Sequence, residues 1–335
     1  SCKEYDVETK SNKVGDFILS KKQHAYEADL KSILGLVREG TTILGANWRR
    51  DELEATSGSI DKGVYTLAFY GQPEQKFLQY MTATVGARYT HHETFGDRFT
   101  PKATLMYSPG AFNFRATYSA GFRAPGLDEL YYHYYAVNRG KPQISFGNQS
   151  LKPEKSNYFA LNAEYHTDKL LMSVTGYINL INDMVVKQNI DVDDASLAML
   201  QGEFPEMSAE EASKLERYSL YQNSDKGDVK GVQVNVSANL FQVFNLSANW
   251  AYTYARTKSG SEWSVLERSI RNSATLAANY HHAWGRYALN VNLNGRLQSK
   301  TYYTGSYEDA PGYGVWNLNT THTFDCTTWA LLEPS

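Results

Sequence analysis

Five consecutive residues of the chain could form a ligand site, because a histidine stands among four tyrosines directly after a strand-like stretch. They are Tyr131, Tyr132, His133, Tyr134 and Tyr135. Flat aromatic rings contact large planar or hydrophobic molecules, an imidazole can ligate a metal, and the nearby Arg139 and Lys141 could attract acidic groups. A simpler interpretation is that the tyrosines form an aromatic belt at a membrane interface and that His133 is a loop residue without a ligand.

Two histidine doublets are further candidates for metal or ligand contact. His91-His92 precedes an expected outer loop, and His281-His282 falls in an expected tight turn. Adjacent residues on a strand point to opposite faces, so neither doublet makes a good chelate in β geometry. His91 and His92 remain secondary candidates for ligand or metal contact, and the second doublet is expected to be solvated.

Other kinds of function find little support. The chain has no G-x-S-x-G, HExxH or phosphate-binding glycine loop, so we expect no enzyme activity. Its 33 basic and 36 acidic residues give a net charge of -3 without a basic stripe, which argues against a nucleic-acid partner. Two cysteines near opposite ends, Cys2 and Cys326, indicate neither a zinc site nor a disulfide framework.

The elements that must position these residues are strands. The stretch "VQVNVSANL" from Val232 and the stretch "FNLSANWAYTY" from Phe244 alternate apolar with polar residues. Each is about as long as the 9 to 11 residues that a tilted strand needs to cross a bilayer. The polar positions hold Asn, Gln, Ser and Thr, which suits a wet lumen better than the solvated face of a soluble β-sandwich or propeller, the main alternative.

The connections between strands alternate in length. Tight turns near 38–40, 108–110, 166–169, 241–243 and 281–285 alternate with longer links near 50–62, 123–156, 187–218 and 256–270. An antiparallel transmembrane β-barrel has this organisation, with short periplasmic turns and long external loops. We predict an all-β, antiparallel transmembrane barrel with about fourteen candidate strands. Ser208 and Glu211 form a capping box that predicts a short helix in the third long link, about 208–218.

Two ordered motifs give the chain a family resemblance. The stretch "GFRAPGLDELYY", followed by "GNQSLKPEKSNYFALNAEY", resembles TonB-dependent outer-membrane receptors, which carry an FRAP box and an NPDLKPE-like box. The matching residues are Phe122, Arg123, Ala124, Pro125, Asn148, Leu151, Lys152, Pro153 and Glu154. The second box lacks its usual proline. Further pieces, such as "KGVQVNV" and "APGYGVWNLN", extend the resemblance over about 25–324.

The resemblance implies a location and an assembly. Such receptors lie in the outer membrane of Gram-negative bacteria, in contact with its lipid, and their barrels of about twenty-two strands enclose an N-terminal plug that couples to the TonB complex. Residues 1–335 show too few strands and no segment resembling the plug. We therefore expect them to be a partial receptor barrel, with the plug and the terminal strands absent.

The resemblance also implies a transported ligand. A histidine between the two boxes is a feature of haem-uptake receptors, where it can be an axial ligand to iron. This favours energy-coupled uptake of haem, with His133 on the iron, and a surface haem-binding lipoprotein as an additional partner. Haem or a ferric chelate would be cargo, and no resident cofactor is required. A ferric-siderophore receptor, a cobalamin receptor and a passive porin are the alternatives.

Overall fold

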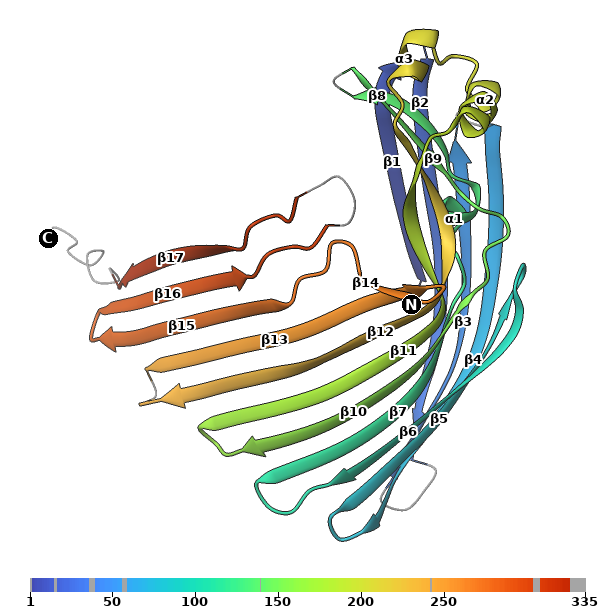
Figure 1. Cartoon of the computed structure of the whole chain (residues 1–335). Coiled ribbons are helices and arrows are strands. Elements are labelled where there is room, and N and C mark those ends of the chain that lie inside the picture. The colour runs from blue at the N-terminus through green and yellow to red at the C-terminus, as the bar shows by residue number, and fades with distance from the viewer. Residues whose placement is uncertain are drawn as a thin grey trace, which may run out of the picture.

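A computed structural model describes residues 2–14, 17–35, 40–55, 59–138, 140–241, 243–303 and 308–325. Arg139 lies outside these ranges. The chain forms one large curved antiparallel sheet, which is open in Figure 1 with β17 at one edge. Its main strands are β1 (Cys2–Val14), β2 (Phe17–Leu34), β3 (Gly40–Ala55), β4 (Ile60–Leu78), β5 (Met81–His92), β6 (Gly96–Tyr107), β7 (Phe112–Arg123), β10 (Glu154–His166), β11 (Leu170–Asp191), β12 (Arg217–Leu240), β13 (Phe244–Ser259), β15 (Asn272–Trp284), β16 (Tyr287–Gln298) and β17 (Tyr313–Phe324).

These fourteen strands form a meander, each antiparallel to the next. The expected partial antiparallel barrel of about fourteen strands is confirmed. In the described part of the chain the sheet has seventeen strands, because three short ones lie within the long links. They are the hairpin of β8 (His133–Asn138) with β9 (Lys141–Phe146), and β14 (Glu262–Val265), which pairs with β13.

The strand registers separate an apolar face from a polar face. Val234 lies opposite Trp250, and Asn235 lies opposite Asn249, so residues of one kind meet across neighbouring strands. The apolar face is open: Trp250 is 42% exposed and Leu161 is 70% exposed. A soluble sandwich would bury such a face against a second layer, and within the described residues no second sheet covers it. Lipid is the environment that this face requires.

The two faces give a direct test in bilayers. We expect a spin label at Trp250 to be accessible to oxygen dissolved in lipid, and a label at Asn249 to be accessible to a water-soluble nickel reagent. Adjacent residues on one strand lie at nearly the same depth and differ mainly in the face to which they point, so each label is the control for the other. Val234 and Asn235 provide the same comparison on β12. A lipid-exposed label at Asn249 together with a water-exposed label at Trp250 would contradict the transmembrane assignment.

Aromatic pairs lie at the end of the sheet that carries the tight turns. The rings of Phe112 and Tyr165 lie 4.9 Å apart, and those of Trp284 and Tyr287 lie 5.8 Å apart, each pair beside a short connection. Such rings suit a membrane–water interface, where an apolar body meets a polar edge. In an outer-membrane barrel the short turns lie on the periplasmic side, so we assign this end to the periplasm from its tight turns.

The strands at the opposite end extend further than the sequence pattern predicted. The link expected over 50–62 is much shorter, because β3 and β4 stay paired out to Ala55 and Ile60. β11 and β12 likewise continue to the pair Asp191 and Arg217. Beyond the bilayer both faces of a strand meet water, so the alternation that revealed the transmembrane part is no longer required.

The longest links contain helices as well as strands. α1 is Leu127–Tyr131, α2 is Asp194–Glu203 and α3 is Ala209–Ser213. The capping box that predicted α3 is confirmed: the Ser208 amide donates to Glu211 Oε2 at 2.7 Å, and the Glu211 amide donates to Ser208 Oγ at 3.2 Å. We did not predict α2, although Asp193 caps it by accepting from the Ser196 amide at 2.8 Å. None of these helices has the length and apolar character needed to cross a membrane.

The main buried apolar cluster lies in the external loops. The helices of the β11–β12 link pack on the β8–β9 hairpin, at the upper end of the sheet in Figure 1. The cluster, which we name the loop core, consists of Tyr135, Ile144, Leu200, Phe204, Met207, Ala212 and Leu215. Burial of these side chains joins two links that are about sixty residues apart in the sequence, and it gives the outer mouth of the barrel a defined shape.

Candidate ligand-binding site

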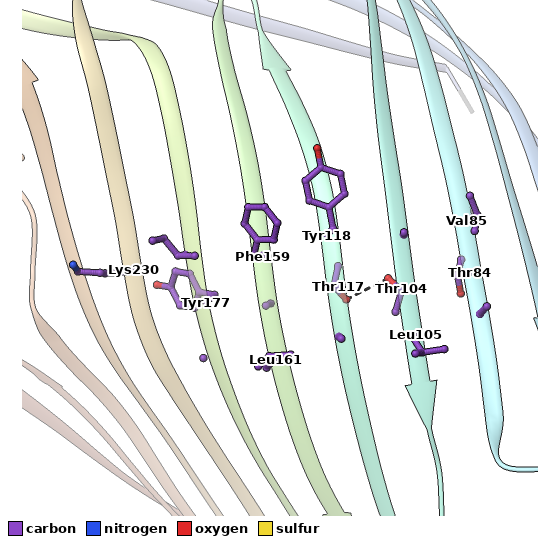
Figure 2. A pocket seen from close by; sticks show the side chains of 16 residues that line it. Thr84, Val85, Thr104, Leu105, Thr117, Tyr118, Phe159, Leu161, Tyr177 and Lys230 are labelled. Atoms are coloured by element: carbon purple, nitrogen blue, oxygen red, sulfur yellow. Dashed lines mark hydrogen bonds between the residues drawn. The ribbon is translucent and has the colours of Figure 1, made fainter.

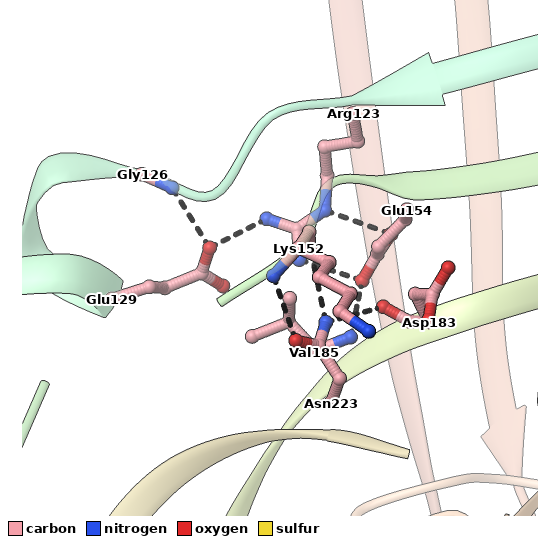
Figure 3. A network of polar contacts seen from close by, with 8 residues as sticks. All are labelled: Arg123, Gly126, Glu129, Lys152, Glu154, Asp183, Val185 and Asn223. Atoms are coloured by element: carbon pink, nitrogen blue, oxygen red, sulfur yellow. Dashed lines mark hydrogen bonds and ion pairs between the residues drawn. The ribbon is translucent and has the colours of Figure 1, made fainter. Parts of the chain in front are cut away.

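The FRAP box ends β7 in a charged network, shown in Figure 3. Arg123 donates to both carboxylate oxygens of Glu154, at 2.9 and 2.7 Å, and to Glu129 Oε2 at 2.8 Å. The Gly126 amide donates to Glu129 Oε2, and the Val185 amide donates to Glu154 Oε1, each at 2.8 Å. One guanidinium therefore fastens α1 and two further strands to the end of β7. Pro125, which cannot donate in a ladder, is buried just beyond it.

The second box is fastened to β12. Asn148 Nδ2 donates to the carbonyl oxygen of Tyr221 at 3.1 Å. Asn223 accepts from the Lys152 amide at 2.8 Å and donates to the Lys152 carbonyl at 2.9 Å. Leu151 and Pro153 are buried between these contacts. In the described structure, the motif residues fix where the long link leaves and re-enters the sheet.

The five-residue stretch that suggested a ligand site divides in two. Tyr135 is 1% exposed and lies in the loop core, with its ring 5.6 Å from Phe204, and this burial raises the pKa of its phenol. His133 stacks on Phe204 at 4.3 Å, and its Nε2 lies 3.7 Å from Glu203 Oε2. Both residues therefore pack the link between β7 and β10 against α2.

Of the other three tyrosines, Tyr131 and Tyr132 lie near lysines from distant strands. Lys21 Nζ is 5.2 Å from the centroid of the Tyr132 ring, and Lys187 Nζ is 6.0 Å from it. Lys62 Nζ is 5.4 Å from the centroid of the Tyr131 ring. Tyr134 stacks on Tyr132 at 5.7 Å, and Tyr221 lies 5.9 Å from Lys187 Nζ. We name these residues the tyrosine–lysine cluster: Tyr131, Tyr132, Tyr134, Tyr221, Lys21, Lys62 and Lys187.

The cluster combines cations and rings at the mouth of the barrel. By strand alternation its three lysines lie on the polar face, toward the external ends of β2, β4 and β11. Lys21 pairs with Asp128 at 3.5 Å, whereas no described carboxylate lies within ion-pair distance of Lys62 or Lys187. Burial raises the pKa of the Tyr132 phenol. The sequence did not indicate these lysines, because they are separated from one another by 41 and 125 residues.

Lys141 does not join His133 as expected. It is exposed where β9 begins, whereas His133 pairs with Phe146 at the far end of the same hairpin. Five residue steps separate the two positions, which is about 17 Å along the strands. The fold therefore does not place His133 and Lys141 so that one could bind the iron and the other an acidic group of the same ligand.

The doublet His91-His92 is divided between two environments. His91 Nδ1 lies 2.7 Å from Asp97 Oδ1, while His92 is 6% exposed and its Nδ1 accepts from the amides of Thr94 and Phe95 at 3.2 and 3.3 Å. Across the described part of the chain, no three His, Cys, Asp or Glu side chains are grouped to hold a metal ion. Separation onto opposite faces, as the strand pattern predicted, prevents a chelate.

Below the tyrosine–lysine cluster, the polar face is hollowed into a pocket of about 700 Å³. Asn47 Nδ2 donates to Glu27 Oε1 at 3.0 Å, and Arg49 forms an ion pair with Asp51 at 2.6 Å. These paired side chains form an ordered polar surface. In an empty barrel the same face would meet only water. Its lining includes Gln23, Glu27, Asn47, Arg49, Asp51, Arg88, Thr90, His92, Arg123 and Asp128.

Comparison with known proteins identifies this combination of barrel and motifs. Residues 5–332 match the family described as "TonB dependent receptor-like, beta-barrel". The chain belongs to the TonB-dependent receptor family. As in its relatives, which are outer-membrane receptors of Gram-negative bacteria, the transmembrane sheet lies in the outer membrane.

The sequence relatives of this receptor barrel include iron-related proteins. It is 24% identical over 238 residues to the iron-regulated outer membrane virulence protein of Vibrio cholerae, covering 69% of this chain and 34% of that protein. It is 23% identical over 294 residues to the ferric enterobactin receptor of Pseudomonas aeruginosa, covering 78% of this chain and 38% of that protein. The alignments thus span little more than a third of the relatives' length.

Solved structures support the same fold. A mutant of the Pseudomonas aeruginosa ferric enterobactin receptor in complex with enterobactin superimposes with a TM-score of 0.67 at 19% identity, over 92% of this chain and 48% of that one. A copper transporter, OprC, superimposes with a TM-score of 0.65 at 13% identity, over 90% of this chain and 50% of that one. Because cargoes differ across similar barrels, the choice of ligand must be argued from the site.

Proposed function

We propose that this receptor barrel belongs to a transporter for energy-coupled uptake of an anionic, aromatic ferric siderophore. The observation that carries the proposal is the tyrosine–lysine cluster at the external mouth of the lumen. A ferric chelate built from catechol-type groups is large, flat in parts and negatively charged. Tyrosine rings would contact its aromatic groups, and lysines would neutralise its charge.

The charge balance of the cluster favours such a ligand. Neither Lys62 nor Lys187 forms an ion pair with a described carboxylate, so both ammonium groups face the lumen mouth without a directly bound anion. Charges of one sign in a cleft with low-dielectric walls raise the local concentration of an oppositely charged ligand. The named ligand of the Pseudomonas relative, ferric enterobactin, is consistent with this proposal.

Haem remains the competing ligand, and the surroundings of His133 argue against it. The imidazole lies between Phe204 and Phe146, at ring distances of 4.3 and 5.6 Å, and its side chain is 21% exposed. Coordination of haem iron by this residue would require the loop core to open. The His133 role, and with it the surface haem-binding lipoprotein, therefore stays a prediction of the sequence. Cobalamin lacks the negative charge that the lysines would attract.

Transport requires more than the described sheet. We propose that the lumen pocket faces a plug domain and that the plug couples the receptor to the TonB complex, as the family membership implies. The ordered polar surface around Asn47 and Arg49 is a suitable wall for a folded plug. A plug would bury these polar groups, buried polar groups require hydrogen-bond partners, and these side chains already have them. In this scheme the ferric chelate is cargo and the receptor performs no chemical step.

Charge reversal of the two unpaired lysines tests the ligand assignment. We expect Lys62→Glu with Lys187→Glu to weaken binding of ferric enterobactin by about 100-fold, since each charge-assisted contact contributes about 1.5 kcal/mol or more. Equilibrium binding of iron-55-labelled chelate to outer membranes that carry the receptor measures this. Lys169→Glu, in an exposed periplasmic turn, is the matched control and should bind like the unaltered receptor.

The same preparations separate a siderophore from haem. Titration with haem should give no receptor-dependent shift of the Soret band, and His133→Ala should leave chelate binding unchanged. A Soret shift that disappears in His133→Ala, together with unaltered binding in the double lysine variant, would overturn the siderophore assignment and support haem.

A further inference from the structure

An apolar groove crosses the lipid-facing side of the sheet, away from the ligand site. It has a volume of about 930 Å³ and spans β5, β6, β7, β10, β11 and β12. Large side chains line it, including Val85, Leu105, Phe159 and Leu161, as Figure 2 shows. Small residues form its floor, and a Cβ atom built on Gly176 would meet nothing within 4 Å.

The strand registers place this groove on the apolar face. Gly176 lies opposite Val232, on the side of β12 that also carries Val234 and meets Trp250. Phe159 lies opposite Ile178, which in turn lies opposite Lys230. Because directly opposite residues share a face, the groove faces lipid and ends at a lysine.

Lys230 also belongs to a group of cations around one tyrosine. Its Nζ is 5.5 Å from the centroid of the Tyr254 ring, and the guanidiniums of Arg256 and Arg271 are 5.9 and 4.9 Å from the same centroid. Arg256 is paired with Asp228 at 2.7 Å. Among the described residues no carboxylate lies within ion-pair distance of Lys230 or Arg271, so two positive charges remain uncompensated.

The position of Tyr254 along β13 places these cations at the external membrane interface. Tyr254 is ten residues beyond Phe244, which follows a periplasmic turn. Ten residues span about 34 Å along a strand, or about 25 Å along the membrane normal at the usual tilt, which equals the height of the apolar band. A lysine and an arginine at this level lie where lipid phosphates lie, and their charges there require an anion.

We propose that this face binds a phosphate-bearing lipid of the outer leaflet, with its phosphates against Lys230 and Arg271 and an acyl chain in the groove that ends at Lys230. The two cations select a lipid whose headgroup carries phosphates. The groove runs up to these cations, so the acyl chain of the same lipid lies in it. Tyr254 holds the cations at the interface by its ring. The site is independent of the ligand that passes through the lumen.

Competitive lipid binding to the purified receptor in detergent, followed by native mass spectrometry, tests the proposal. The probes are diphosphoryl lipid A, monophosphoryl lipid A with the same acyl chains, and inorganic phosphate. We expect Lys230→Gln and Arg271→Gln each to weaken diphosphoryl lipid binding about fivefold, the order of contribution of one basic residue near an anionic surface. Lys169→Gln, on the periplasmic side, should have no effect.

The groove and the headgroup can be tested separately. Gly176→Leu should fill the groove and weaken binding of both lipids, and the unaltered receptor should prefer the diphosphoryl form about fivefold. Equal affinity for the two lipids, or equal binding by Lys230→Gln and Lys169→Gln, would overturn the proposal. Displacement of the lipid by millimolar inorganic phosphate would assign the cations to free phosphate instead. If a variant fails to fold, the relative affinity of the unaltered receptor for the diphosphoryl and monophosphoryl lipids decides the question.

Discussion

Arg123→Ala is expected to detach the external loops from the barrel while leaving the transmembrane sheet assembled. The substitution removes three hydrogen bonds and leaves the carboxylates of Glu129 and Glu154, 18% and 15% exposed, facing each other without a cation. Charged groups that lose their partner in a partly buried site cost about 2–4 kcal/mol. Because the network joins α1 and β11 to the end of β7, the lost stability mainly affects the link over 124–153.

Limited proteolysis and ligand binding measure this effect. In outer membranes, we expect cleavage within 124–153 to accelerate at least tenfold and binding of the ferric chelate to weaken by a similar factor. Arg115→Ala on the same strand is the matched control, since its only described hydrogen bond goes to the sulfur of Met106. Arg123→Lys keeps the charge but cannot form the forked contact with Glu154, so an intermediate result is expected. Unchanged proteolysis in Arg123→Ala would refute the anchoring role.

Gly147→Ala is expected to disrupt the ligand site from below. The Gly147 amide donates to the carbonyl of Tyr132 at 2.6 Å, so the two segments are in close contact. A Cβ on Gly147 would lie 2.5 Å from the backbone nitrogen of Tyr132 and 2.6 Å from that of Tyr131. Backbone atoms cannot rotate away as the end of a side chain can, so α1 and its tyrosines must shift.

The expected result is a loss of chelate affinity of tenfold or more without a change in the amount of receptor in the membrane. Binding of iron-55-labelled chelate, normalised to receptor detected at the cell surface, measures it. Gly202→Ala is the control, because it lies in an external helix where an added Cβ meets nothing within 4 Å. If the two variants bind alike, the contact of Gly147 with α1 does not position Tyr131 and Tyr132.

The lipid-facing and lumen-facing positions could be predicted from short windows of sequence. Val234 and Asn235 differ in face because each strand alternates, and pairing of Val234 with Trp250 follows once neighbouring strands are antiparallel. The helix at Ser208 was equally local, since a capping box uses residues three apart. The strand ends were not predictable in this way, because above the bilayer the polarity pattern no longer depends on strand geometry.

The sequence by itself determined the membrane-spanning alternation, the two family boxes and the cap of α3, because each depends on residues within about ten positions of one another. Only the tertiary structure decided what His133 contacts, because Phe204 reaches it from a link about seventy residues later. It likewise decided that Lys21, Lys62 and Lys187 meet the tyrosines of one loop. Curvature of the sheet brings the external ends of distant strands together, and that curvature depends on the pairing of all the strands between them.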